Sequence, residues 1–593
     1  MKYKITWSGL LACGIMLGSC TKVLDKLPEN TLSYSQMYRD IYDADAAVVG
    51  LYGKLMGLAK QYVVLNELRG DLMEVTDNAD GWLREINLNK VSADNPYANP
   101  RPFYALINDC NDVLKNFKIM LASNKLKTVE YQQRYSDVGA LRSWLYLQLG
   151  IHWGQVPYVT DPLETVDAVK DQTKFQPLPF NQLLDTLIRF TSQLPFLAPY
   201  PTGVGVNVNL VTSVDGTLTQ RFFIDKYNLL GDLNLWKGNY RAAASNYRLI
   251  MEHTGYDLDN PNGLYSGGTQ FYQEFRQSYA DVVDHNDLCV GYVRFQEMNQ
   301  YALIENNTQG WRSMFSRTPD ALFRQQWLWA LPFNSNFSPT NPFIDLFSNN
   351  GGSYLVKPSQ QAIDNWNSQR QDNGFPFDAR GGFSYKIIGG QPVIMKYLYN
   401  YVDPTSLIPV NPLVKNGQWF LQRSASVHLR FAEAANREGR FKLAYALVNK
   451  GINNTFDTSN VAGRDVTNLQ NTLTDPETVY QFDARNGEYP RYRGDWYRNA
   501  GIRGCAYVRE LPLAAGDTTI AIENSILAEG ALELAYEGYR WSDLMRISLR
   551  RNDPAILATA VYNKLLKDGI PGASDTRDRL MNPGNWYLPF KWK

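Results

Sequence analysis

Apolar residues recur at helical spacing in three segments of the N-terminal part of the chain, residues 41–58, 103–121 and 131–150. Such spacing places apolar side chains on one face of an α-helix. In the second segment these positions are Leu106, Ile107, Cys110, Val113, Leu114 and Phe117, and in the third they are Leu141, Leu145 and Leu149. The pattern predicts three helices that pack through their apolar faces.

Two later segments share the pattern Gly-x-aromatic-x-x-Ala. It occurs in NLWKGNYRAAASNYRLIM and again in NREGRFKLAYALVNKGI, and a helix-compatible run precedes each copy, at 223–236 and 426–436. The pattern resembles the turn of a tetratricopeptide hairpin, where Gly closes the loop and a small Ala lets the second helix approach. The matching residues are Gly238, Tyr240 and Ala243, then Gly439, Phe441 and Ala444. A scaffold of helical hairpins is therefore predicted.

A long stretch of different character separates the two hairpins. It contains the β-like run CVGYVRFQEM (289–298) and the proline-rich loop LPFNSNFSPTNPF (331–343). Insertions between helical repeats map to one face, which is often the binding face. We therefore predict one domain, 31–593, with a helical scaffold at about 31–260 and 420–455 plus a C-terminal helix, and ligand-region insertions at about 60–100 and 261–420.

The N-terminus has the layout of an export signal. The basic start MKYK is followed by the apolar run ITWSGLLACGIMLG, whose last two residues begin the tetrapeptide LGSC, residues 17–20. This run is too short to span a membrane, and LGSC looks like a bacterial lipobox. We predict a signal peptide at 1–19, lipidation of Cys20, and a tether at 20–30. Ordinary secretory cleavage beside an incidental thiol is the alternative.

Composition narrows the class of partner. The chain has 593 residues with 59 basic and 59 acidic side chains, so no net charge favours nucleic acid. Aromatic residues make up 13% of it, which favours a sugar-stacking surface in an exported protein. Beyond Cys13 and Cys20, only Cys110, Cys289 and Cys505 remain, and their odd number and wide spacing predict buried thiols.

Catalytic motifs are absent from the sequence. None of the four histidines, His152, His253, His285 and His428, has a second ligand at metal-binding spacing, and neither a phosphate-binding loop nor a nucleophile elbow occurs. The carboxylate pairs Glu74 with Asp77 and Glu537 with Asp543 are available for glycoside hydrolysis, but 59 acidic residues produce such pairs by chance. We therefore predict a protein that is not an enzyme and holds no metal or cofactor.

Two C-terminal motifs have structural interpretations. In AYEGYRWSDLMRI, Glu537, Arg540, Asp543 and Arg546 recur every three residues with alternating charge, which predicts an ion ladder along one helix. The tetrapeptide GIRG at 501–504 predicts a tight turn that directs Arg503 inward to carbonyls or a carboxylate.

Several segments in order resemble one family. The lipobox, YALINDCNDVL, GALRSWLYLQLGIHWGQVPYV, GNYRAAASNY, HLRFAEAANREGRF, GIRG and AYEGYRWSDLMRI together resemble the SusD/RagB family of outer-membrane nutrient-binding lipoproteins, from Cys20 to the closing YLPFKWK. The resemblance implies a mostly α-helical SusD-like fold. Tetratricopeptide-like hairpins would form its scaffold, and a loop-rich region with minor strands would carry the ligand site.

The resemblance also implies a function. Members of the family bind without catalysis, on the cell surface, and deliver oligosaccharides or polysaccharides to a SusC-like TonB-dependent outer-membrane transporter. For this chain it implies a lipid-anchored, surface-exposed protein of the outer membrane that needs no cofactor and binds no nucleic acid. Peptide capture, as in the RagB branch, is the alternative, and a glycoside hydrolase is the third possibility.

Candidate ligand residues fall in two aromatic segments. TDNADGWLRE supplies Asn78, Asp80 and Trp82, the last either stacking on a sugar or filling the scaffold. NNTQGWRSMF supplies Gln309, Trp311 and Arg312. Rings stack on sugar faces while amides, carboxylates and arginines bond the hydroxyl groups.

A composite site around Trp82 and Trp311 is therefore predicted, with Tyr301 and Asn336 as further members. Trp144, Trp236 and Trp541 lie in helical patterns and are expected to be packing residues.

Overall fold

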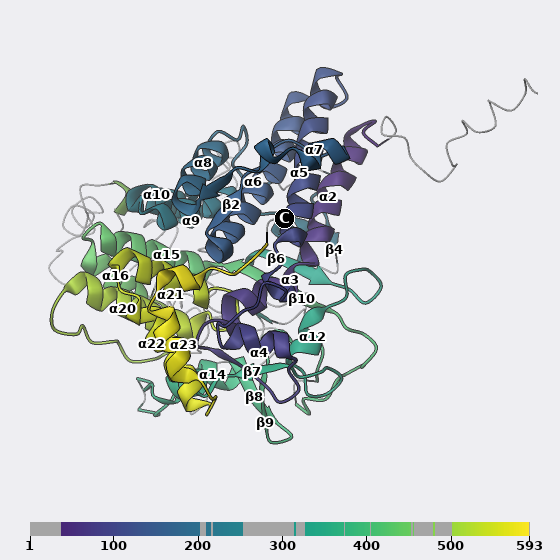
Figure 1. Cartoon of the computed structure of the whole chain (residues 1–593). Helices are drawn as coiled ribbons and strands as arrows, with labels where there is room; N and C mark the ends of the chain where they lie inside the picture. Colours follow the sequence, from purple (N-terminus) through teal and green to yellow (C-terminus); the bar gives the residue numbers. More distant parts are fainter. Residues whose placement is uncertain are drawn as a thin grey trace, which may run out of the picture.

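The computed structural model describes residues 37–201, 209–214, 217–252, 314–315, 327–372, 374–403, 405–451, 455, 478–480 and 501–591 (Figure 1). The predicted signal peptide, Cys20, the tether and the β-like run 289–298 lie outside these residues. Within them, no helix is both long enough and apolar enough to cross a membrane.

The three predicted N-terminal helices are present. Their apolar faces are buried as expected, and Cys110 is a fully buried thiol on one of them. The second and third pack against each other, and the third is buried on nearly all sides along its C-terminal half. The helices are α2 (Ile41–Met56), α5 (Arg101–Ala122) and α6 (Thr128–Trp153), followed by α8 (Phe180–Ser192).

Both predicted hairpin turns are confirmed. α9 (Lys226–Lys237) leads into α10 (Tyr240–Glu252), and α15 (Ser424–Arg437) leads into α16 (Phe441–Val448). Gly238 and Gly439 join them with φ angles of 88° and 78°, a left-handed conformation that costs glycine nothing. Ala243 and Ala444 are fully buried, where a larger side chain would push the paired helices apart.

The first hairpin offers a test of this close approach. A Cβ atom on Gly231 of α9 would overlap the ring of Tyr247 on α10. This ring is held in place because the Tyr247 hydroxyl donates to Asp232 Oδ1 at 2.7 Å. Gly231→Ala is therefore expected to lower the free energy of unfolding by about 1–3 kcal/mol, despite the better helix propensity of alanine. Gly50→Ala on α2, where nothing lies within 4 Å, is the matched control. Equal stability of the two variants in urea denaturation would contradict the packing.

Successive helices pack on one another to form the scaffold. α2 contacts α5, and the series continues through α6, α8, α9, α10, α15 and α16 to α20 (Figure 1). Where the sequence suggested one C-terminal helix, the described residues form several: α19 (Ile502–Cys505), α20 (Thr518–Glu533), α21 (Arg540–Arg551), α22 (Ala555–Lys567) and α23 (Ala573–Leu580). The mostly α-helical scaffold is confirmed.

The strands are short and pair two by two, all antiparallel, within the described residues. Trp327, Trp329 and Trp419 of the longest pair are buried, and the loop 334–341 follows that pair's first strand. The pairs are β6 (Trp327–Phe333) with β10 (Gly417–Arg423), β1 (Met73–Val75) with β7 (Val356–Pro358), β8 (Tyr385–Ile388) with β9 (Gln391–Ile394), β2 (Gln155–Pro157) with β3 (Pro177–Pro179), and β4 (Ser213–Val214) with β5 (Thr217–Leu218).

Short helices fill the connections between these elements. They are α3 (Ala59–Val63), η2 (Val64–Leu68), α4 (Gly81–Asn87), η3 (Pro96–Ala98), α7 (Val166–Lys170), η4 (Gln172–Phe175), η5 (Thr219–Phe222), α12 (Pro342–Phe347), α13 (Gln360–Asn367), α14 (Ala379–Ser384), η8 (Thr478–Tyr480) and η10 (Pro583–Trp586). In Figure 1, α4 and α12 lie with β7, β8 and β9 below the centre of the view, to the right of the stacked helices α15, α20 and α21.

The predicted ion ladder is wrong in most of its length. The segment is not one helix, because α20 ends at Glu533 and α21 begins at Arg540. Glu537 pairs instead with Lys396 and Arg423, and only the Asp543–Arg546 pair, 2.8 Å, forms as predicted.

A distant carboxylate holds the break between α20 and α21. Glu67 of η2 accepts the backbone N–H groups of Tyr536 (3.2 Å), Gly538 (2.7 Å) and Tyr539 (2.8 Å). Gly538 has φ 92° and packs directly on the ring of Tyr62, so the chain turns where helical periodicity continues in the sequence. A contact between residues so far apart in the sequence leaves no local signal.

Arg503 is directed inward, as predicted for GIRG. Its Nε donates to the carbonyl of Arg509 at 2.7 Å, and its Nη1 donates to Glu529 Oε2 at 2.9 Å. The backbone forms the short helix α19 where the sequence suggested a tight turn.

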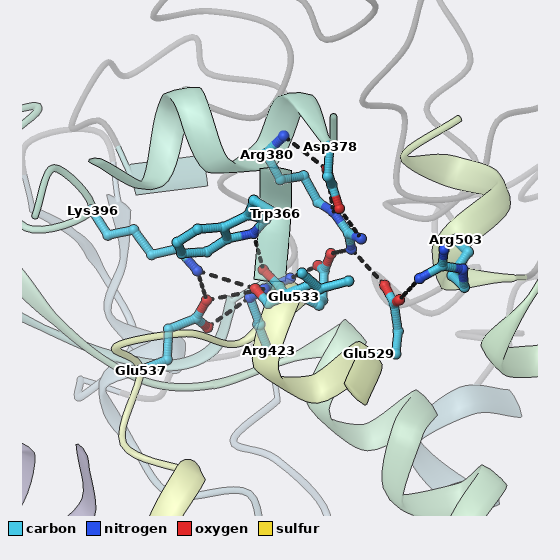
Figure 2. A network of polar contacts seen from close by, with 10 residues as sticks. Trp366, Asp378, Arg380, Lys396, Arg423, Arg503, Glu529, Glu533 and Glu537 are labelled. Atoms are coloured by element: carbon cyan, nitrogen blue, oxygen red, sulfur yellow. Dashed lines mark hydrogen bonds and ion pairs between the residues drawn. The ribbon is translucent and has the colours of Figure 1, made fainter. Parts of the chain in front are cut away.

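A fully buried ion network joins the insertion between the hairpins to α20 (Figure 2). Arg380 of α14 contacts Glu529 and Glu533 of α20, each at 2.6 Å, and Arg423 of β10 reaches Glu533 at 2.6 Å. Among the described residues the network has four cations and four carboxylates, so that each buried charge has an opposite charge beside it. Its members are Arg380, Lys396, Arg423 and Arg503 with Asp378, Glu529, Glu533 and Glu537. These contacts fix the strand-bearing insertion on the helical scaffold.

Candidate functional site

Asn78, Asp80 and Trp82 lie together where β1 leads into α4. Asp80 is the N-cap of α4, and its Oδ1 accepts the backbone N–H of Leu83 at 2.8 Å. Capping residues satisfy the free N–H groups of a first helical turn, which explains why the chain bends into a helix here. Trp82 occupies that first turn and is 40% exposed, so it does not fill the scaffold interior.

The pairing of β1 with β7 brings a distant segment to the same place. Asn78 Nδ2 donates to the carbonyl of Ser353 at 3.0 Å, and the Ser353 hydroxyl is bonded to Asp345 of α12. The N–H of Thr76 adds a bond to the carbonyl of Leu355 at 3.0 Å. Through Ser353, these bonds hold Asp345 close to Asn78. The sequence alone had indicated only the residues around Trp82 as members of this cluster.

Tyr97 completes the cluster. Burial raises the pKa of its phenol, and the nearby carboxylates Asp80 and Asp345 raise it further, so the hydroxyl stays neutral. Gln61 Nε2 donates to the carbonyl of Tyr97 at 2.8 Å, which fixes its backbone. Neutral phenols both donate and accept hydrogen bonds.

We call Asn78, Asp80, Trp82, Tyr97 and Asp345 the Trp82 platform. The platform combines one exposed aromatic side chain, Trp82, with an amide, two carboxylates and a neutral hydroxyl, and both carboxylates lie near the Tyr97 hydroxyl. A ring can stack on the apolar face of a sugar, while carboxylates accept hydrogen bonds from its hydroxyl groups. The arrangement suits a polyhydroxylated ligand.

Comparisons with known proteins identify the architecture. No family model matches the chain, and no curated protein is similar to it in sequence. Among solved structures, a SusD superfamily protein from Bacteroides vulgatus superposes with a TM-score of 0.54 at 13% identity, covering 93% of this chain and 96% of its own.

The chain has a SusD-like fold. A surface glycan-binding protein A from Bacteroides uniformis gives a TM-score of 0.54 at 15% identity, over 93% of this chain and 96% of that one. The surface glycan-binding protein A of Bacteroides thetaiotaomicron, solved in complex with laminarihexaose, gives 0.53 at 13% identity, over 92% and 96%. The SusD-like architecture implied by the ordered motifs is thereby confirmed.

The other predicted ligand residues are not joined to the platform in the described part of this SusD-like chain. Asn336 is exposed in the loop after β6, where its N–H donates to Asn334 Oδ1 at 2.9 Å. Tyr301, Gln309, Trp311 and Arg312 lie outside the described residues. The composite site with Trp311 therefore stays a prediction.

In each carboxylate pair singled out for hydrolysis, at least one member forms part of the SusD-like scaffold. Glu74 is buried, and this burial raises its pKa, although the ammonium of Lys564 opposes the shift. Glu537 is buried between two cations, and Asp543 pairs with Arg546. Of the four side chains only Asp77 is exposed. Within the described ranges, no three His, Cys, Asp or Glu side chains gather as metal ligands do.

The packing tryptophans are placed as expected. Trp144 and Trp541 are buried, and Trp236 is half-buried, with Arg546 5.5 Å from the centre of its ring. Sequence reasoning missed Tyr97 and Asp345. Tyr97 follows the turn pair Asn95-Pro96 near Trp82, which is a usable signal, whereas nothing local marks Asp345.

Proposed function

We propose that this protein captures glycans without cleaving them and that the Trp82 platform is part of its binding surface. The observation that carries the proposal is the exposed side chain of Trp82, two residues after Asp80, whose carboxylate lies with that of Asp345 near the Tyr97 hydroxyl. An exposed aromatic side chain beside hydrogen-bonding groups is the arrangement that stacking on a sugar requires.

The structural neighbours support the ligand class. Two of them are surface glycan-binding proteins, one in complex with laminarihexaose, and another is a SusD-like carbohydrate-binding protein from Bacteroides fragilis with a TM-score of 0.53 at 14% identity. The commitment of Glu74 and Glu537 to buried contacts supports binding without hydrolysis.

The cellular part of the proposal comes from the sequence. The lipobox supports anchoring through Cys20 in the outer membrane, and the resemblance to SusD/RagB proteins supports delivery of the glycan to a SusC-like TonB-dependent transporter. Balanced charge, 59 basic against 59 acidic side chains, gives no support for nucleic acid as a partner.

Trp82→Ala is expected to weaken glycan binding at least about tenfold, because a central aromatic anchor contributes more than 1.4 kcal/mol at a binding surface. Tyr42→Ala is the matched control, since Tyr42 is an aromatic residue 68% exposed on α2, away from the platform. The measurement is calorimetric titration with laminarihexaose and with any polysaccharide that the parent retains in an affinity gel.

Unchanged affinity of Trp82→Ala for a glycan that the parent binds would reject the platform as the site. Saturable binding of peptides, with no heat of binding for any glycan, would favour peptide capture instead. Cleavage of the sugar that depends on a single carboxylate would establish a hydrolase.

A further inference from the structure

A separate cavity lies against the N-terminal half of α5 and has no part in the Trp82 platform. Its volume is about 470 Å³, against about 20 Å³ for each of two other cavities in the described residues, one beside Glu433 and one beside Trp236. Small-molecule sites fall in the range of roughly 300–1,000 Å³. This cavity is therefore large enough for an organic ligand.

The cavity joins two segments that the glycan proposal leaves unused. YALINDCNDVL supplies Tyr104 and Asn108 from α5, and the closing YLPFKWK supplies Phe590 and Lys591. The tail is held in place because the N–H of Leu588 donates to the carbonyl of His152 at 2.8 Å. In Figure 1 the C-terminal end runs up to α5 in agreement with this contact.

The walls are preformed. Tyr104 donates its hydroxyl to the carbonyl of Pro157 at 2.7 Å, and Asn111 Nδ2 donates to the carbonyl of Val159 at 3.1 Å. Asn108 Oδ1 accepts the N–H of Leu163 at 2.7 Å. These bonds tie α5 to the end of β2 and to the segment that follows it, so this wall of the cavity is fixed by the fold.

The lining is apolar with positive charge at the mouth. Tyr104, Phe175 and Phe590 supply rings, while Arg101 and Lys591 are exposed and supply the charge. Arg101 lies 5.3 Å from the centre of the Phe590 ring, which orients the guanidinium.

Within the described residues, the side chains that line the cavity supply no carboxylate to its cations. Among the described residues no aspartate or glutamate lines the cavity, and no described group bonds the amide nitrogen of Asn108. The N-terminal end of α5 adds to the positive potential. An apolar chamber with donors and cations at its rim is complementary to an apolar molecule that carries one anionic group.

We propose that this cavity binds a small carboxylate whose apolar body is about the size of one aromatic ring. The ring enters among Tyr104, Phe175 and Phe590, and the carboxylate meets Arg101 and Lys591. The inference is independent of glycan capture, because it involves different residues and a different ligand.

The test uses a matched pair of ligands on the intact purified chain. Calorimetric titration with 3-phenylpropionate is expected to show saturable 1:1 binding, and 3-phenylpropanamide, which keeps the ring and loses the charge, is expected to bind at least about tenfold more weakly. No saturable binding of 3-phenylpropionate, or equal affinity for the two, would overturn the proposal.

Variants locate the binding in the cavity. Val169→Trp, at an exposed lining position of α7, is expected to fill the cavity and abolish binding, whereas Val166→Trp on the same helix does not face it and should bind as the parent does. Arg101→Gln with Lys591→Gln should remove the preference for the carboxylate. Retained binding in Val169→Trp would overturn the proposal. If Val169→Trp has a lower Tm than the parent, its loss of binding is disregarded, and the comparison of 3-phenylpropionate with 3-phenylpropanamide on the parent protein is the test.

Discussion

Replacing Arg423 by methionine is expected to lower the free energy of unfolding by about 3–5 kcal/mol, the usual cost of breaking one partner out of a buried ion pair. Arg423 is fully buried, and its guanidinium reaches Glu533 Oε1 at 2.6 Å, Glu537 Oε2 at 2.7 Å and the carbonyl of Glu533 at 2.7 Å. Methionine has much of the side-chain length of arginine but no charge. Glu533 and Glu537 would therefore each lose one of their cations at a site that water does not reach. The expected readout is a lower urea midpoint.

Arg39→Met is the matched control for this prediction. Arg39 forms an i,i+4 pair with Asp43 at 2.9 Å on the surface of the protein, and exposed pairs of this kind contribute little to stability. We expect no measurable change for it. A loss in Arg423→Met as small as that in Arg39→Met would contradict the role assigned to the network.

Acidification is expected to remove a second contribution to the stability of the fold, which comes from an ion cluster that joins α15 to α21. Burial by itself would raise the pKa of Glu433, but the guanidinium groups of Arg546 and Arg550 overcome this and lower the pKa to about 2. A carboxyl whose pKa falls on folding stabilises the protein above its unfolded pKa of about 4.5 and loses that contribution as the pH drops toward 2. The contribution is on the order of 3 kcal/mol.

Glu433→Gln isolates this contribution from the other acidic groups. The variant should be less stable than the parent at pH 7, and the gap should narrow between pH 4.5 and 2 as the parent takes up the proton that glutamine never binds. Urea denaturation of both proteins across that range is the measurement. A gap that stays constant, or widens, in acid would show that the two arginines do not stabilise the ionised form.

The helical scaffold was accessible from the sequence because its signals are local. Gly238 and Gly439 each sit a few residues from the small alanine that their hairpin needs, so one short window contains the whole pattern. The break at Gly538 was not accessible, because the carboxylate that holds it, Glu67, lies at the other end of the chain. Helical periodicity alone then extended one helix across a turn.

The same distinction applies to the candidate site. Asp80 and Trp82 are predictable because a capping residue and an aromatic residue stand only two positions apart in the sequence. Asp345 reaches them only through the pairing of β1 with β7, which a single sequence does not reveal. The cavity beside α5 was missed for the same reason, since Tyr104 and Phe590 come together only in the folded chain.

Glycan capture is tested most directly by calorimetric titration of the chain from Thr21 onward against a panel of polysaccharides, oligosaccharides and peptides, with the sugars analysed for cleavage afterwards. The proposed function predicts saturable heat with one class of glycan and recovery of that glycan intact. No heat of binding with any glycan, or recovery of cleaved sugar, would contradict the proposed function.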